Sequence, residues 1–202
     1  MQKSQAERVD TATQILDVAE RLVQVRGFNG FSYADIAAEL EITKAALHYH
    51  FAGKAELGQA LIGRYTTRFA AALAGVEASI ADASARLDAY ADIYLNVLRE
   101  HRMCLCGMMA AEYETLPTPM QDAVVRFFDD NYAWLGRLLE TGRAERSLEF
   151  VGSPEAAAQM IVGTLEGAML VARPYGDAAR FEAVASLLMS EFARDGAPAR
   201  RR

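Results

Sequence analysis

The sequence predicts an all-α protein, with an N-terminal tri-helical helix-turn-helix domain joined to a larger helical domain. Ala, Leu, Glu and Arg, which favour helices, are abundant, and β-branched residues are scattered. Apolar residues recur at the three- and four-residue spacing of helices. Capping residues, Gly and Pro punctuate these repeats. We place the first domain at residues 1–53 and the second at residues 54–202.

Three helices are predicted in the first domain, a longer one followed by two short ones. Four apolar residues share one face of the first helix: Ile15, Ala19, Leu22 and Val23. Gly27 follows them as a left-handed cap. Ser32 and Asp35 have the spacing of a capping box at the start of the second helix. Thr43 is the expected N-cap of the third helix, which runs over residues 44–51.

A long fourth helix is expected after Gly53 and is shared by the two domains. Five more helices are expected at residues 84–101, 103–116, 120–140, 154–173 and 178–193. Gly142 is expected to close the helix of residues 120–140, and Ser153 with Pro154 to open the next one. Residues 195–202 are expected to lack regular structure.

The second and third helices, separated by a turn of about three residues, have the arrangement of a helix-turn-helix. Five apolar residues are expected to pack the pair: Ile36, Ala37, Leu40, Ile42 and Leu47. The other positions of the third helix are left for DNA: Thr43, Lys44, Ala45, Ala46, His48, Tyr49 and His50. Thr43 and Lys44 lie at the positive end of the helix dipole, which favours phosphate. Small Ala45 and Ala46 permit close approach to base edges.

The stretch RGFNGFSYADIAAELEITKAALHYHFAGKAEL resembles the TetR/AcrR family of repressors. It has a Gly-aromatic turn, Ser/Thr-x-x-x-Ile-Ala, an aromatic-x-x-Phe ending and Lys-x-x-Leu, over about the first quarter of the chain. The resemblance implies phosphate contacts from four residues: Ser32, Tyr33, Tyr49 and Lys54. It places Thr43 to Ala46, with His48, in the groove. Glu41 replaces the family's frequent Gly or Ala in the turn, at a cost of about 1 kcal/mol if its backbone is left-handed. His48 replaces its usual Tyr.

The distribution of charge confines DNA contact to the start of the chain. The protein has a net charge of −6, with 21 Lys and Arg against 27 Asp and Glu. Residues 1–68 hold 8 of each sign, so the excess of acidic residues lies entirely beyond them. An acidic surface repels phosphates, so only the first segment is suited to double-stranded DNA.

Two other functions stay open: a protein-interaction module formed by the first three helices, and a small helical enzyme. No catalytic motif supports the enzyme.

The last two helices are expected to form a homodimer, because a single helix-turn-helix reads too few base pairs and dimers read palindromes. One stripe contains Met160, Thr164, Ala168 and Val171, near the small residues Gly163 and Gly167. The other contains Phe181, Val184, Leu188 and Phe192. Packing of both stripes inside one subunit is the alternative.

The middle of the chain is rich in Met and aromatic residues, which is typical of a pocket for a small apolar or aromatic effector. Eight residues are candidates for contact with it: Met108, Glu112, Phe127, Phe128, Asn131, Trp134, Thr164 and Glu166. Ordinary core packing is the alternative for each. Such an effector would tilt the fourth helix and change the spacing of the two recognition helices.

Cys104 and Cys106 suggest a second way of regulation, by an oxidant or electrophile. His101 and Arg102 are close enough in sequence to lower a thiol pKa. A pair two residues apart on a helix points in different directions, so a disulfide between them requires unwinding. We expect no cofactor, no metal, no membrane span and a cytoplasmic location.

Overall fold

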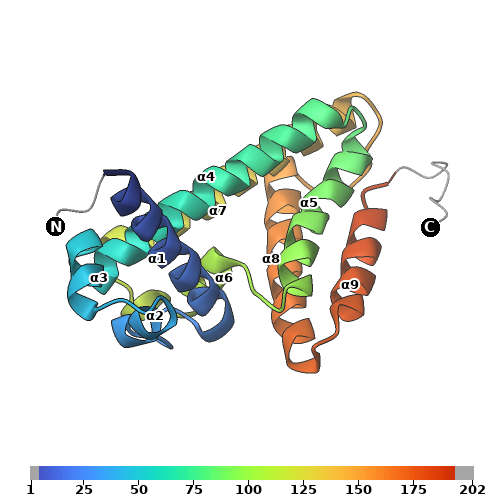
Figure 1. The fold of residues 1–202 in the computed structure, drawn as a ribbon. Coiled ribbons are helices and arrows are strands. Elements are labelled where there is room, and N and C mark those ends of the chain that lie inside the picture. The colour runs from blue at the N-terminus through green and yellow to red at the C-terminus, as the bar shows by residue number, and fades with distance from the viewer. Residues whose placement is uncertain (1–4, 194–202) are drawn as a thin grey trace. The chain divides into compact units, whose positions relative to one another are not determined.

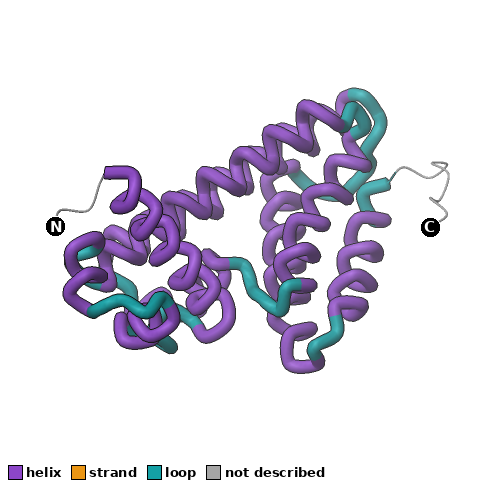
Figure 2. Tube along the Cα trace, viewed as in Figure 1, coloured by secondary structure: helices purple, strands orange, loops and turns teal. Residues whose placement is uncertain are grey.

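The computed structural model describes residues 5–193 as an assembly of helices (Figures 1 and 2). The α-helices are α1 (Gln5–Arg26), α2 (Tyr33–Glu39), α3 (Lys44–His50), α4 (Lys54–Ser79), α5 (Ala83–Arg99), α6 (Leu105–Ala111), α7 (Thr118–Ala144), α8 (Pro154–Ala172) and α9 (Ala178–Ser190). Two 3-10 turns, Tyr113–Thr115 and Arg173–Tyr175, lie between them. Within this described range there is no β-strand, so the all-α prediction is confirmed. The predicted irregular tail, residues 195–202, lies outside the described residues.

The chain divides into two compact units. Unit one contains the residues up to Arg68 together with Arg102–Phe127, and unit two contains Phe69–His101 with the residues from Phe128 onward. Both α4 and α7 therefore contribute one part to each unit. The predicted domain boundary after residue 53 stays a prediction.

The core of unit one forms around α1. Its four predicted inward residues are buried, and α1 ends where Gly27 adopts a φ of 86°. Ile36 from α2 and Leu47 from α3 are fully buried in the same unit, as are Leu57 and Leu61 from α4. Helices α1 and α2, α2 and α3, and α1 and α6 pack together. The helix-turn-helix is therefore supported on α1 and α4 rather than standing alone.

Unit two is built around the packing of α5, α8 and α9, which run side by side in Figure 1. Phe181, Leu188 and Phe192 turn into this core with exposures of 1%, 8% and 1%. These three residues were expected at the dimer stripe. They pack inside the subunit instead, because the face of α9 that carries them lies against the other helices.

Among the predicted helix ends that differ from the structure, two differ by more than three residues. Helix α7 continues through Gly142 to Ala144, because the missing side chain makes room for Leu148: a Cβ at Gly142 would lie 2.5 Å from Leu148 Cδ1. The helix expected at residues 103–116 is divided. Helix α6 ends at Ala111, and the amide of Glu112 donates to the Met109 carbonyl at 3.1 Å, which tightens the chain into a 3-10 turn.

Candidate DNA-binding site

The start of α2 is fixed by the predicted capping box. The Ser32 hydroxyl accepts from the Ala34 amide at 3.2 Å, and the Asp35 carboxylate accepts from the Ser32 amide at 2.8 Å. The hydrogen bonds from Ser32 lower the pKa of the Asp35 carboxyl, and the charge of Arg26 adds to this shift. Ser32 is exposed, so its hydroxyl is placed at the protein surface at the beginning of a helix, where anions are favoured.

The turn between α2 and α3 has the left-handed backbone that the sequence raised as a possibility. Glu41 has a φ of 52°, and the Ile42 amide donates to the Ala37 carbonyl at 3.0 Å. Thr43 then caps α3, with its hydroxyl accepting from the Ala46 amide at 3.1 Å. These bonds set the direction in which α3 leaves the turn.

Helix α3 presents most of its residues outward. Leu47 is fully buried and anchors the helix, while Tyr49 is 66% exposed. The other residues left for DNA at this helix are exposed or, for Ala46 and His50, half-buried: Thr43, Lys44, Ala45, Ala46, His48 and His50. A short helix held by one buried leucine, with small and polar residues outward, has the form of a recognition helix.

Tyr33 and His48 form a pair that ties α2 to the end of α3. Their ring centroids are 4.9 Å apart, and the Tyr33 hydroxyl donates to the Phe51 carbonyl at 3.0 Å. Nδ1 of His48 lies 3.1 Å from the Ala52 carbonyl oxygen. Burial, and to a lesser degree the charge of Glu56, raise the pKa of Tyr33 to about 12. Tyr33 therefore stays a neutral donor, and its hydroxyl is used to hold the loop after α3.

Lys54 is also engaged inside unit one. Its ammonium group donates to the Phe31 carbonyl and lies 4.8 Å and 4.2 Å from the ring centroids of Phe28 and Phe31. Burial lowers the pKa of Lys54, and the carboxylates of Glu112 and Asp35 oppose that shift. In this structure the lysine fastens the start of α4 to the loop before α2. A phosphate contact would require it to turn outward.

Glu112 holds the turn that follows α1, a role that sequence reasoning missed. Its Oε2 accepts from the Phe28 amide at 2.6 Å and from the Asn29 amide at 3.2 Å. The Asn29 side chain donates to Thr115 Oγ1 at 2.7 Å. The sequence carries no local sign of these bonds, because their partners are more than eighty residues apart. They connect the end of α6 to the helix-turn-helix.

The eight candidate effector residues are divided between the two units. Met108, Glu112 and Phe127 belong to unit one, and the remaining five belong to unit two: Phe128, Asn131, Trp134, Thr164 and Glu166. The Glu112 carboxylate is engaged by backbone amides, so it is not a candidate for contact with an effector in unit two. Phe127 is buried, and its ring lies 5.6 Å from that of Tyr65.

Two of the candidates in unit two meet at Tyr90. The Tyr90 hydroxyl donates to Asn131 Oδ1 at 3.1 Å, and the Tyr90 ring stacks on Trp134 at 5.7 Å with an interplanar angle of 16°. The indole nitrogen of Trp134 is buried and has no hydrogen-bond partner in the protein. A buried donor of this kind is costly and marks a position where a ligand acceptor can bind. Thr164 and Glu166 are half-buried on α8.

The two cysteines and the acidic residues offer little chemistry of their own. Cys104 and Cys106 are not joined to each other by a disulfide, and they are 2% and 0% exposed. Cys104 caps α6 and accepts from the Tyr65 hydroxyl at 3.6 Å.

Across the described residues, no group of His, Cys, Asp and Glu is suited to hold a metal ion. Nor does any helix in that range combine the length and apolar character needed to cross a membrane.

The supported, outward-facing α3 defines a DNA-binding regulator of the helix-turn-helix class. Comparison with known proteins agrees. The family model described as bacterial regulatory proteins, tetR family, matches residues 15–61. The model described as tetracyclin repressor-like, C-terminal domain, matches residues 83–188, more than half of the chain. The chain belongs to the TetR family of transcriptional regulators.

This chain is similar to several known proteins over most of its own length and most of theirs. The HTH-type transcriptional repressor NemR of Escherichia coli K12 is 29% identical over 171 residues, covering 81% of this chain and 84% of NemR. A TetR-family regulator from Agrobacterium tumefaciens is 33% identical with a TM-score of 0.90, covering 93% of this chain and 100% of that one. A TetR regulator from Legionella pneumophila is 32% identical with a TM-score of 0.81, covering 95% of this chain and 100% of that one.

Proposed function

We propose that this protein is a repressor that binds a palindromic operator as a homodimer and is released by a small apolar or aromatic effector. The observation that carries the proposal is the exposure of α3, whose polar and small residues surround a single buried anchor, Leu47. The name of NemR, a transcriptional repressor, supports repression rather than activation. A negative protein can bind DNA in this way because its first 68 residues carry no excess of acidic residues.

DNA binding is tested with an inverted repeat taken from the promoter beside the gene. We expect fluorescence anisotropy to show an affinity that falls steeply as salt rises, because phosphate contacts release counterions. Tyr49→Ala is expected to weaken binding at least tenfold. Val151→Ala is the control, since Val151 is an apolar side chain of unit two that is 100% exposed and lies on none of the helices proposed to bind DNA or a partner subunit. Equal affinity of the two variants would remove α3 from the interface.

The proposed dimer uses the exposed face of α8 and α9. Six of the nine large apolar side chains that are exposed in the described residues lie on these helices or on the turn between them: Met160, Leu170, Val171, Tyr175, Val184 and Leu187. Gly163 and Gly167 are exposed on α8, with no atom near the position of a Cβ. A partner backbone can therefore approach closely. An apolar face of this kind is unfavourable in water and is typical of a contact between subunits.

The oligomeric state tests this face directly. Leu187→Glu is expected to convert the dimer to a monomer in sedimentation velocity at micromolar concentration, because the change places a charge in an apolar contact. Val125→Glu is the control, at an exposed valine of α7 in unit one. A wild-type monomer, or a dimer that persists in Leu187→Glu, would contradict the interface.

The proposed effector site lies in unit two, around Tyr90, Asn131 and Trp134. Phe69 and Tyr94 complete the aromatic group, with ring centroids 6.1 Å apart. An aromatic ligand would bind among these rings and accept a hydrogen bond from the Trp134 indole, while Asn131 orients it. Trp134→Phe keeps an aromatic ring and removes this donor. A ligand found by a rise in melting temperature is expected to bind Trp134→Phe about tenfold more weakly, the effect of one hydrogen bond of about 1.4 kcal/mol.

The effect of ligand binding is transmitted to the helix-turn-helix through α4, which belongs to both units. An effector that binds the state unable to bind DNA more tightly, by about 1–3 kcal/mol, relieves repression in part. No observation favours the enzyme or the thiol sensor over this mechanism. The nearly complete burial of both cysteines argues against direct attack on a reagent.

A further inference from the structure

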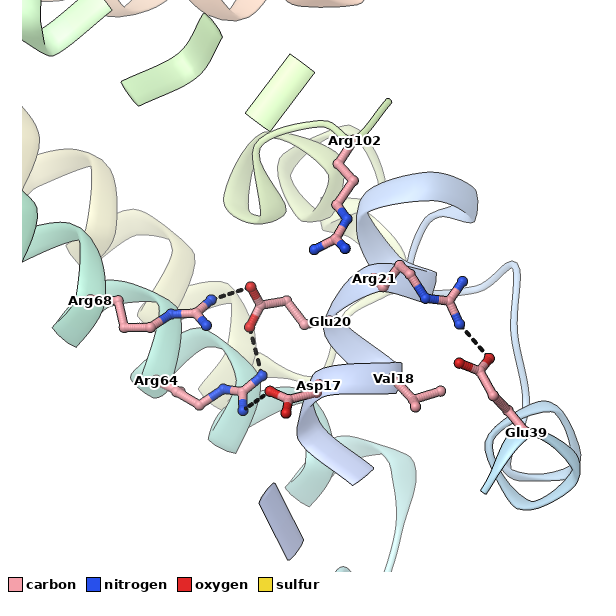
Figure 3. A pocket seen from close by; sticks show the side chains of 8 residues that line it. All are labelled: Asp17, Val18, Glu20, Arg21, Glu39, Arg64, Arg68 and Arg102. Atoms are coloured by element: carbon pink, nitrogen blue, oxygen red, sulfur yellow. Dashed lines mark hydrogen bonds and ion pairs between the residues drawn. The ribbon is translucent and has the colours of Figure 1, made fainter. Parts of the chain in front are cut away.

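A charged cavity of about 360 Å³ lies within unit one, in the size range of small-molecule sites (Figure 3). Four arginines contribute to its wall: Arg21, Arg64, Arg68 and Arg102. Three carboxylates face them: Asp17, Glu20 and Glu39. These residues come from α1, the end of α2, α4 and the segment before α6. The cavity is therefore separate from the aromatic group of unit two and from the recognition helix.

Glu20 organises this cavity. It is 6% exposed, and its two oxygens accept from Arg64 at 2.8 Å and from Arg68. Arg64 also donates to Asp17 at 2.7 Å, and its Nε is buried without an acceptor in the protein. A buried carboxylate bound by two guanidinium groups fixes those groups in place, so little side-chain freedom is lost when they bind a further partner.

The charge of the cavity is positive, although the whole protein is negative. Its lining holds four guanidinium groups and three carboxylates, against a net charge of −6 for the chain. Figure 3 shows Arg102 extending into the cavity toward the space between Glu20 and Arg21. Guanidinium groups present paired N–H donors whose spacing matches the two oxygens of a carboxylate or phosphate.

We infer that this cavity binds a small oxyanion, the phosphate or carboxylate group of a metabolite, as a second regulatory ligand. Arg68 and Arg102 would donate to the oxyanion. The same ligand would compete with Glu20 and Glu39 for the arginines that join α1 to α4 and α2. If the chain is the proposed repressor, its affinity for DNA would change as well, but binding of the anion does not depend on that function.

The test measures the melting temperature of the full chain without DNA, at constant ionic strength adjusted with sodium chloride. Inorganic phosphate, pyrophosphate, acetate and citrate are the probes. The binding anion is expected to raise the melting temperature in a saturable way, by about 5 °C or more near a hundred times its Kd. A response to the phosphates alone or to the carboxylates alone assigns the chemistry of the ligand.

Arg102→Gln and Arg68→Gln are expected to weaken the binding anion at least tenfold, and Arg68→Lys to weaken it less. Arg180→Gln is the control, since Arg180 pairs with Asp177 in unit two. Equal shifts in all four variants, or no shift of the melting temperature with any of the four anions, would overturn the proposal. So would weaker DNA binding with a reduced salt slope in the Arg68 and Arg102 variants without any loss of anion binding. That outcome would assign these arginines to DNA phosphates instead.

Discussion

Replacement of Glu112 measures how strongly α6 holds the helix-turn-helix. Its carboxylate accepts from the Phe28 amide at 2.6 Å, in a partly buried position, and from the Asn29 amide at 3.2 Å, in an exposed one. A hydrogen bond to a charged group contributes about 1.5–3 kcal/mol, against about 1 kcal/mol for a neutral pair. Glu112→Gln keeps an acceptor and loses the charge, so we expect a loss of about 1 kcal/mol. Glu112→Ala removes the acceptor from both amides, and water can replace it only at Asn29, so we expect a loss of about 2–3 kcal/mol.

The assay is urea and thermal unfolding of the full chain at fixed protein concentration. For a chain of this size, 1 kcal/mol corresponds to about 2–4 °C in Tm, so the alanine variant is expected to melt roughly 4–12 °C lower. Glu114→Gln is the matched control, because Glu114 lies on the same 3-10 turn and is exposed. The reasoning would be refuted if Glu112→Ala unfolded at the same urea concentration as Glu114→Gln.

Three further changes test the backbone and caps of the helix-turn-helix. Glu41→Gly is expected to stabilise the protein by about 1 kcal/mol in urea unfolding, because glycine adopts the φ of 52° without strain. Thr43→Ala is expected to cost about 1 kcal/mol and Thr43→Ser much less, because the serine hydroxyl still caps α3; equal losses would show that the cap contributes nothing. Folding lowers the pKa of Asp35, so its stabilising effect is complete above the ordinary carboxyl pKa and is lost as the pH falls through the folded value. The urea midpoints of wild type and Asp35→Asn should therefore converge in acid, and a constant difference between them would contradict this.

The features predicted from sequence were those with local causes. The capping box at Ser32, the cap at Thr43 and the left-handed turn at Glu41 each depend on bonds between residues a few positions apart. Ser, Thr and Asp side chains readily bond to nearby backbone groups, so their presence before a helical pattern indicates a cap. The recognition helix could therefore be located before any tertiary contact was known.

The features that sequence missed depend on contacts between distant segments. Periodicity showed that Phe181, Leu188 and Phe192 share a face of the last helix, but a stripe does not reveal whether its own subunit or a partner covers it. In the same way, Glu112 and Trp134 are both polar groups among apolar residues. Only the fold distinguishes the carboxylate bound to backbone amides from the indole without a partner.

Two carboxylates hold α1 at different points, and together they limit the rearrangements that an effector can cause in this regulator. Glu20 binds Arg64 and Arg68 of α4, and Glu112 binds the turn where α1 ends. Breaking a buried ion pair by removal of one partner costs about 3–5 kcal/mol, more than the 1–3 kcal/mol that effectors usually supply. An apolar effector in unit two therefore lacks the free energy to rearrange unit one internally. In the proposed dimer, a change in recognition-helix spacing would then move unit one as a whole. An oxyanion can act differently, because it offers the arginines a new partner in place of Glu20.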